Sequence, residues 1–317
     1  MSDGEPLLSV VVASYTMERL ADIDGLLASL ESQDYGRIET VVVVEKSREL
    51  YERLRGRADG RRRVVWNGGE GGLSSNRNLG LRESSGEVVA FVGDDVVLDR
   101  GWASQVVRCF GDGTVGGVTG PAYPLWTAPG MDWLPEEFHW LVSCSSWADW
   151  RDLREVRNAW GHNMAFERGA MEAAGPFATA LGLREGKGPL AEDTEFSLRL
   201  RARTGKRILY NPKAVSWHRV HPYRLSWRFI RERSFSMGQS RALMATFARG
   251  LETEGDTLES EQRLLRRILV RLLPRTLLGL VRRPGRSWRR LALTVGSLAW
   301  LSLGYASGLV ERRRWRS

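Results

Sequence analysis

The first two thirds of the chain alternate short apolar runs with stretches of helical spacing. The apolar runs predict strands at Leu7–Ala13, Thr40–Val44, Arg63–Trp66, Val88–Val92, Gly116–Gly120, Met164–Phe166 and Arg207–Tyr210. The spacing between them predicts helices at Met17–Leu30, Arg48–Leu54, Ser74–Glu83 (capped by Ser74 or Ser75), Trp102–Phe110 and Glu192–Arg203. Strands separated by helical crossovers indicate an α/β fold with a mostly parallel sheet and helices on both faces.

The last third has a different pattern. A long basic helix is expected at Ser226–Phe247, followed by an acidic, polar linker at 251–261. Leu291–Val310 is 20 residues without a charge, and such a helix is about 30 Å long, which matches a bilayer core. A buried helix of a soluble bundle is the alternative. We therefore divide the chain into a catalytic domain (1–221), a helix with a linker (222–262) and a basic, apolar, membrane-associated helical region (263–317).

The charge is divided unevenly along the chain. The net charge is +9, but residues 201–317 contain 26 Lys/Arg and 7 Asp/Glu, whereas residues 1–200 contain 21 and 31. A basic region attracts nucleic acid or anionic lipid, and the uncharged run beside it favours lipid. Cys109 and Cys144 have no metal-binding spacing, and the N-terminus lacks the basic region of a signal peptide. A cytoplasmic setting is expected.

Polar residues follow the predicted strands directly. Ser14 and Tyr15 follow the first strand, Glu45 the second and Asp94-Asp95 the fourth. Ligands of open α/β sheets bind at these carboxyl ends, although turns also favour such residues. Adjacent carboxylates repel unless a cation joins them, so Asp94-Asp95 indicates either a divalent-metal site or an exposed acidic turn. No glycine fingerprint follows the first strand, which disfavours dinucleotide binding.

Two further clusters are candidates for chemistry. Glu192-Asp193 lies where a Gly/Pro-rich loop meets a helix, so it could supply a general base or only cap the helix. His218, in the sequence VSWHRVH, could bind a metal or a phosphate, although a lone histidine is often structural. His162 and Asn163 could bind a sugar hydroxyl.

These residues, in this order, resemble the family 2 glycosyltransferases with the GT-A fold. The resemblance covers roughly residues 7–220 and includes SVVVASY, TVVVVEKS, GGLSSNRNLGLRESSGEVVAFVGDD, NMAFER, AEDTEFSLRL and VSWH. It implies an inverting transfer from a nucleotide-sugar donor that needs Mg²⁺ or Mn²⁺. The roles that it implies are nucleotide-sugar binding by Ala13, Ser14, Tyr15, Glu45, Arg77, Asn78 and Asp94, metal binding by Asp95 and His218, and base catalysis by Asp193 with Glu192 beside it.

Two positions depart from the family pattern. Gly93 stands where the family usually has the first acid of an Asp-x-Asp triplet, which puts the number of metal contacts in doubt. Glu45 stands where Asp is common, and it keeps the carboxylate.

The segment DWLPEEFHWLVSCSSW resembles a narrower archaeal group that acts on dolichyl-phosphate sugars in N-glycan assembly, including glucuronosyltransferases. This resemblance implies a lipid-linked acceptor and a place at the cytoplasmic side of the cell membrane, without nucleic acid as a partner. Trp140 would then contact the acceptor, although simple packing of the Trp-rich segment is equally open. The rival functions are a non-catalytic nucleotide-sugar-binding membrane protein and a transferase for a soluble or polysaccharide acceptor.

Overall fold

The computed structural model describes residues 4–182, 190–248 and 259–311. The chain forms two compact units. Unit 1 consists of residues 1–122 and 151–218, and unit 2 of residues 123–150 and 219–317. Most of the Gly/Pro-rich loop before Glu192 and most of the expected acidic linker lie outside the described residues.

Unit 1 is built on an eight-stranded sheet in the order β3-β2-β1-β4-β9-β6-β10-β8. Strands β1, β2, β3 and β4 run parallel to one another, and β6 runs parallel to β10, whereas β9 is antiparallel to β4 and β6, and β8 is antiparallel to β10. The strands are β1 (Leu8–Ser14), β2 (Ile38–Val44), β3 (Arg62–Trp66), β4 (Val88–Gly93), β6 (Val115–Thr119), β8 (Arg154–Val156), β9 (Asn163–Glu167) and β10 (Arg207–Tyr210). The expected mainly parallel α/β sheet is confirmed.

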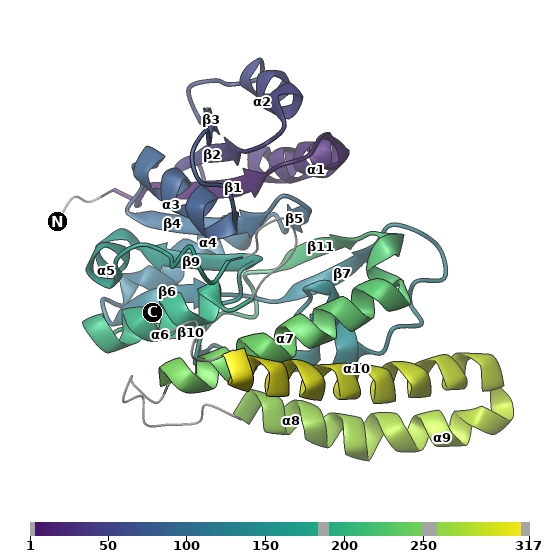
Figure 1. Cartoon of the computed structure of the whole chain (residues 1–317). Coiled ribbons are helices and arrows are strands. Elements are labelled where there is room, and N and C mark those ends of the chain that lie inside the picture. The colour runs from purple at the N-terminus through teal and green to yellow at the C-terminus, as the bar shows by residue number, and fades with distance from the viewer. Residues whose placement is uncertain (1–3, 183–189, 249–258, 312–317) are drawn as a thin grey trace. The chain divides into compact units, whose positions relative to one another are not determined.

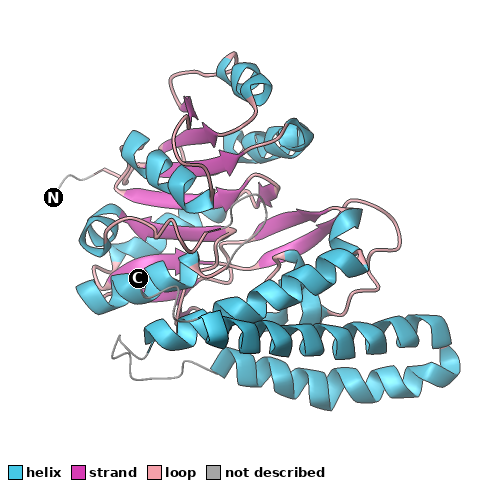
Figure 2. Cartoon of the chain, in the orientation of Figure 1, coloured by secondary structure: helices cyan, strands magenta, loops and turns pink. Residues whose placement is uncertain are grey.

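Alternating side chains of the sheet enter two separate cores. Val10 and Val12 of β1 belong to one apolar cluster, and Val11 belongs to the other. The first cluster includes side chains of α1, α2 and α4, and the second includes side chains of α3, α5 and α6, so helices cover both faces (Figure 2). The continuous Val runs of the central strands are buried on both sides, as in parallel sheets generally.

The helices of unit 1 lie close to their expected positions, except for one short helix at residues 168–174 that was not expected. They are the 3₁₀ turn η1 (Met17–Arg19), α1 (Leu20–Glu31), α2 (Arg48–Arg55), α3 (Leu73–Glu83), α4 (Trp102–Arg108) with the 3₁₀ turn η2 (Cys109–Gly111), α5 (Arg168–Ala174) and α6 (Glu192–Thr204). The residue expected to cap α3 was wrong. The residue that caps α3 is Gly72, which has a φ of 117°, and not Ser74 or Ser75. Glycine adopts this left-handed region at little cost, so backbone geometry sets the start of α3.

A short antiparallel pair extends from the carboxyl end of β4. Strand β5 (Val96–Leu98) pairs with β11 (Ser216–Val220), and His218 lies opposite Val96. Neither strand was expected from the sequence, because β5 has only three residues and β11 mixes polar and apolar positions. The pair brings two segments that are distant in the sequence to the edge where β4 ends.

Unit 2 is mainly helical. Strand β7 (Ala122–Trp126) leads into it, and the 3₁₀ helices η3 (Glu136–Val142) and η4 (Ser146–Ala148) form the Trp-rich segment. After β11 come η5 (Pro222–Leu225), α7 (Trp227–Ala248), α8 (Glu259–Arg267), the π-helical turn η6 (Ile268–Leu272), α9 (Leu273–Arg282) and α10 (Pro284–Glu311). Its core joins Trp133 and Phe138 of the Trp-rich segment to Ile268 and Leu293 of the C-terminal helices.

Helices α7 and α10 pack closely through small residues (Figure 1). A Cβ atom on Gly304 would lie 2.0 Å from the backbone oxygen of Phe235, and one on Gly238 would lie 2.1 Å from that of Leu301. Only glycine permits this contact, which is typical of helices packed in membranes. Within the described residues, Pro284–Val310 is long and apolar enough to cross a membrane, and only 22% of its most apolar stretch is buried. That low burial disfavours the alternative of a soluble core helix.

Candidate active site

The carboxyl ends of β1, β2, β3 and β4 lie in register at one edge of the sheet. Ser14 is paired with Val44, and Ala13 with Gly93. The residues that follow these strands therefore gather at the same edge. The hydroxyl of Ser14 donates a hydrogen bond of 2.6 Å to Oδ2 of Asp94, which joins the end of β1 to the turn after β4.

Asp95 is a buried carboxylate at this edge, with 5% of its surface exposed. The pairing of β5 with β11 places His218 beside it, and Nε2 of His218 lies 3.1 Å from Oδ1 of Asp95. His218 is also buried, with 2% exposed. The structure thus brings together the two residues expected to bind a metal.

Arg19 also contacts Asp95, which was not expected from the sequence. Its Nη1 atom lies 3.2 Å from Oδ2 of Asp95 and 3.0 Å from Oδ2 of Asp22. Arg19 ends the turn η1, which directly follows the β1 loop. The signal that could have indicated it is its place five residues after the end of a strand whose neighbour ends in two carboxylates.

Glu45 fixes the loop before α3. Its Oε2 atom accepts a hydrogen bond of 2.7 Å from the backbone N–H of Gly72, and the carboxylate is 6% exposed. Ala13 is half-buried at the end of β1, whereas Tyr15 beyond it is 48% exposed. This edge therefore presents a carboxylate and an accessible aromatic ring.

A second cluster joins α3 to the start of α6 around Gly161. Nη1 of Arg77 lies 2.9 Å from Oε1 of Glu192, and Nη2 of Arg77 donates to the carbonyl oxygen of Gly161 at 2.8 Å. The N–H of Gly161 donates to Oδ2 of Asp193 at 2.8 Å. One loop residue thus holds both the arginine and the candidate base.

The two acids of this cluster have different environments. Glu192 is 4% exposed, and within the described part of the chain its Oε2 atom has no hydrogen-bond partner. Burial and the neighbouring charge of Asp193 raise the pKa of Glu192, while Arg77 opposes that shift. Asp193 is half-buried and accepts a second hydrogen bond, of 2.7 Å, from the N–H of Thr194. Asp193 is the more accessible of the two carboxylates.

Aromatic rings connect the two clusters. The ring centroids of His162 and His218 lie 6.4 Å apart, and Trp160 stacks on His162 at 6.5 Å. His162 follows Gly161 directly. A continuous chain of contacts therefore leads from Asp95 through the two histidines and Gly161 to Asp193, all within unit 1.

Three other candidates lie elsewhere or are already engaged. Both ends of the Asn78 amide bond to the backbone of Phe177, at 2.8 and 2.9 Å. Asn163 is 1% exposed, accepts from the indole of Trp102 at 2.8 Å and donates to the backbone at 2.9 Å. These contacts give both asparagines a structural role. Trp140 belongs to unit 2, where it packs on Phe138 with ring centroids 6.3 Å apart.

The donor set around Asp95 fits a hard divalent cation. Asp95 and His218 offer a carboxylate oxygen and an imidazole nitrogen, the atoms that Mg²⁺ and Mn²⁺ accept. Across the described ranges, no three His, Cys, Asp or Glu residues are close enough to hold a metal alone. A site of this kind holds its ion with few protein ligands and takes the others from phosphate oxygens and water.

A mainly parallel sheet with an acidic turn at its carboxyl edge and a second carboxylate at a helix start defines a GT-A type transferase fold. The chain belongs to glycosyl transferase family 2, whose family model matches residues 9–175. The model for glycosyl transferase family group 2 matches residues 148–311. The protein is therefore a glycosyltransferase, as expected.

Two relatives support this assignment. The chain is 31% identical over 240 residues to the glucosyl-dolichyl phosphate glucuronosyltransferase of Haloferax volcanii, covering 75% of this chain and 77% of that protein. It is 29% identical over 188 residues to the succinoglycan biosynthesis protein ExoM of Rhizobium meliloti, covering 56% and 55% of the two chains. The first confirms the resemblance to the archaeal dolichyl-phosphate group.

Solved structures share the fold. The mannosyltransferase PcManGT from Pyrobaculum calidifontis, solved with GDP-Man and Mn²⁺, superposes with a TM-score of 0.62 at 20% identity. That comparison covers 97% of this chain and 88% of the other. GalNAc-T7, solved with UDP, GalNAc and Mn²⁺, gives a TM-score of 0.53 at 15% identity, covering 83% of this chain and 54% of that one.

Proposed function

We propose that this protein is an inverting glycosyltransferase that moves a sugar from a nucleotide-sugar donor to a lipid-linked acceptor at a membrane. The observation that carries the proposal is the chain of contacts between Asp95 and Asp193 within unit 1. It connects a candidate diphosphate site to a candidate base. The Haloferax relative, named for transfer to a dolichyl-phosphate-linked sugar, supports the acceptor class.

The donor would occupy the carboxyl edge of the sheet. Ala13, Ser14, Tyr15 and Glu45 would contact the base and ribose. Asp95 and His218 would hold Mg²⁺ or Mn²⁺, with Asp94 beside them. When bound, such an ion stabilises the negative charge that develops on a leaving diphosphate. Arg19 already contacts the carboxylate of Asp95, so a bound metal ion would compete with the guanidinium of Arg19 for that carboxylate.

Asp193 is the candidate base because it is accessible and fixed by two backbone N–H groups. In the proposed step its carboxylate takes the proton of the acceptor hydroxyl. The acceptor oxygen forms a bond to the anomeric carbon while the bond from that carbon to the diphosphate oxygen breaks. A single displacement of this kind inverts the anomeric centre. Glu192 would keep Arg77 in place and would not take part in proton transfer.

Unit 2 would hold the enzyme at the membrane and receive the acceptor. Its helix α10 is apolar and mostly exposed, and Trp140 lies in the Trp-rich segment of the same unit. We propose the cell membrane as the location, with unit 1 on the cytoplasmic side, where nucleotide sugars are made. Nucleic acid has no role in this proposal.

Asp193→Asn tests the base. The asparagine keeps the side-chain shape and one of the two accepted hydrogen bonds but cannot take a proton, and loss of a positioned general base costs about 10²–10⁴ in rate. We expect transfer of radiolabelled sugar to a polyprenyl-phosphate-linked acceptor to fall by that factor, while donor binding, measured by thermal shift with Mn²⁺, stays unchanged. Asp152→Asn, at a largely exposed acid of the same unit, is the matched control. Near-native transfer by Asp193→Asn would refute the assignment.

Asp95→Asn tests the metal site. The change removes the charge that a divalent ion needs, so we expect Mn²⁺-dependent donor binding to weaken by at least tenfold. Donor binding of equal strength with and without Mn²⁺ in both forms would contradict the proposal. If the wild-type protein binds donor but neither transfers nor hydrolyses it, the protein is a nucleotide-sugar-binding protein without catalytic activity.

A further inference from the structure

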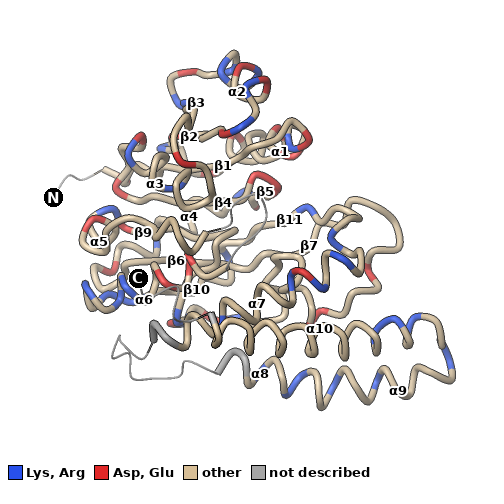
Figure 3. The backbone as a smooth tube through the Cα atoms, in the orientation of Figure 1, with Lys and Arg blue, Asp and Glu red and all other residues tan. Residues whose placement is uncertain are grey.

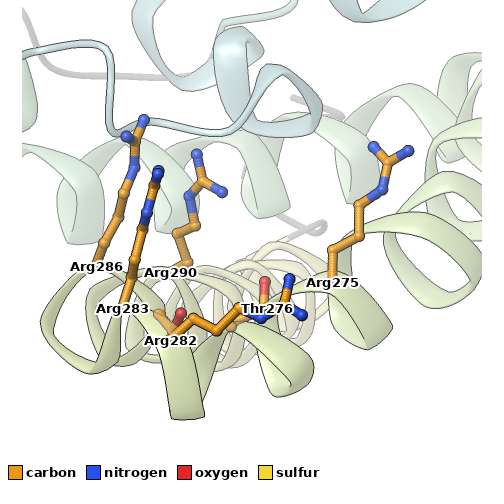
Figure 4. A pocket seen from close by; sticks show the side chains of 8 residues that line it. Arg275, Thr276, Arg282, Arg283, Arg286 and Arg290 are labelled. Carbon is orange, nitrogen blue, oxygen red and sulfur yellow. The ribbon is translucent and has the colours of Figure 1, made fainter.

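Arginines gather where helix α9 ends and helix α10 begins. Figure 3 shows the concentration of basic residues along this hairpin. Five of them line one pocket together with Thr276, and they are Arg275, Arg282, Arg283, Arg286 and Arg290. In Figure 4 the side chains of Arg283, Arg286 and Arg290 extend in the same direction. The pocket lies entirely within unit 2.

The positive charge of this pocket is only partly compensated. The sequence contains no Asp or Glu between Arg263 and Val310. Arg286 lies 3.6 Å from the carboxylate of Asp132, which is 70% exposed. Among the described residues, no carboxylate forms an ion pair with Arg275, Arg282 or Arg283. Guanidinium groups held together in this way attract an anion, and phosphate is the anion whose geometry they match best.

Arg290 lies among the other arginines of the pocket and is fixed in place. Its Nε atom donates to the carbonyl oxygen of Trp133 at 3.2 Å, which fixes the side chain. Arg286 lines the same pocket, so two like charges lie near each other and repel. A bound anion would relieve this repulsion.

Thr276 is a second, independent indication of a ligand. Its side chain lines the pocket and is 3% exposed, yet its hydroxyl has no hydrogen-bond partner among the described residues. A buried hydroxyl without a partner is unfavourable, so such groups usually have one. A phosphate oxygen held by the surrounding guanidinium groups would supply the missing acceptor.

The surroundings of the pocket indicate that the phosphate belongs to a lipid. Leu278 and Val281 of α9 are 75% and 90% exposed, and Trp288 of α10 is 60% exposed. Arginines beside exposed apolar side chains and an exposed tryptophan are typical of helices at a membrane interface. A soluble phosphate would gain nothing from this apolar rim, whereas acyl chains would cover it.

We propose that the arginine pocket binds the phosphate of an anionic phospholipid headgroup at the membrane surface. It is a lipid site in unit 2 that fixes the α9–α10 hairpin at headgroup depth. The proposal rests on the membrane association of unit 2 proposed above, but not on sugar transfer. The experiment distinguishes these two proposals. A protein that does not bind neutral vesicles would contradict the membrane association of unit 2, whereas the pocket predicts only a preference for anionic over neutral vesicles.

The experiment is vesicle flotation with the full-length protein. The vesicles are phosphatidylcholine alone or phosphatidylcholine with phosphatidylglycerol, at physiological salt. Each basic side chain near an anionic surface contributes about fivefold to partition, so Arg275→Gln, Arg282→Gln and Arg283→Gln together should reduce the anionic preference by roughly 100-fold. Binding to neutral vesicles should not change. The control combines Arg53→Gln, Arg82→Gln and Arg108→Gln, which removes the same charge from exposed positions of unit 1.

Thr276→Val distinguishes a pocket from a diffuse basic surface. The change is nearly isosteric, leaves the charge unaltered and removes the hydroxyl that lacks a partner. We expect the melting temperature without lipid to stay equal or rise, and the anionic preference to fall by about threefold to tenfold. An unchanged preference in Thr276→Val would overturn the site.

The other outcomes of the vesicle experiment either overturn the proposal or identify another source of the phosphate. Equal binding of the wild-type protein to neutral and anionic vesicles would overturn the proposal. So would a control triple variant that loses as much preference as the pocket variant. Inorganic phosphate that raises the melting temperature, without any preference for anionic vesicles, would identify a soluble anion instead. A preference shown only by vesicles with polyprenyl phosphate would assign the pocket to the acceptor.

Discussion

The buried ion pair between Arg77 and Glu192 offers the sharpest test of how unit 1 holds its candidate site. The two side chains are 6% and 5% exposed and meet at 2.9 Å. Arg77→Met removes the charge and the donor but keeps an unbranched side chain. The carboxylate of Glu192 would then be buried beside Asp193 without its counter-ion.

The structure sets the size of the effect. Removing one partner of a buried pair costs about 3–5 kcal/mol, because the other charge stays desolvated. One oxygen of Glu192 already lacks a partner within the described chain, so little can compensate. We expect Arg77→Met to destabilise unit 1 by that amount at neutral pH. The loss should shrink toward pH 4, because Glu192, whose pKa is already raised, would protonate and lose its charge.

The assay is urea unfolding in detergent, with hydrogen exchange of the β1 and β4 amides reporting unit 1 alone. Arg77→Met, Glu192→Gln and the double variant form a thermodynamic cycle. The double variant should be at least 2 kcal/mol more stable than the sum of the single changes predicts, since it buries no unpaired charge. Strict additivity, or a loss for Arg77→Met that does not depend on pH, would refute the reasoning.

Two further predictions concern unit 2. Gly304→Ala should separate α7 from α10, because its Cβ would lie 2.0 Å from a backbone oxygen, whereas Gly296→Ala has nothing within 4 Å and should stabilise α10 by about 0.5–1 kcal/mol. Melting temperatures in detergent compare the two, and equal shifts would contradict the packing. Burial lowers the pKa of His139 to about 4, so unit 2 should lose about 3 kcal/mol as the pH falls from about 6.5 to 4. His139→Gln should flatten that pH profile, and an unaltered profile would count against it.

The apolar strands and amphipathic helices were predictable because their burial has a regular period. Strands β1, β2, β3 and β4 follow the Val-rich runs almost to the residue. Strands β5 and β8 have three residues each and are too short to show a period, so only pairing in the folded protein defines them.

Part of the candidate site was predictable from the positions of its residues at the ends of the predicted strands. Ser14, Glu45 and Asp95 follow parallel strands, and parallel register brings such ends together. Arg19 was not predictable, because its contact with Asp95 depends on how the turn η1 directs one side chain. The side-chain amides of Asn78 and Asn163 could bind a sugar hydroxyl, but both already donate hydrogen bonds to backbone carbonyl oxygens.

The pairing of β5 with β11 has a consequence for the order in which the enzyme matures. Asp95 is made early during synthesis, whereas His218 ends unit 1, and Arg77 meets Glu192 across 115 residues of chain. Neither cluster can close until nearly the whole of unit 1 has left the ribosome. A nascent chain that stops before β11 would have a finished β1–β4 sheet but would lack His218 of the candidate metal site. The candidate donor site is therefore complete only as the C-terminal helices of unit 2 are being made.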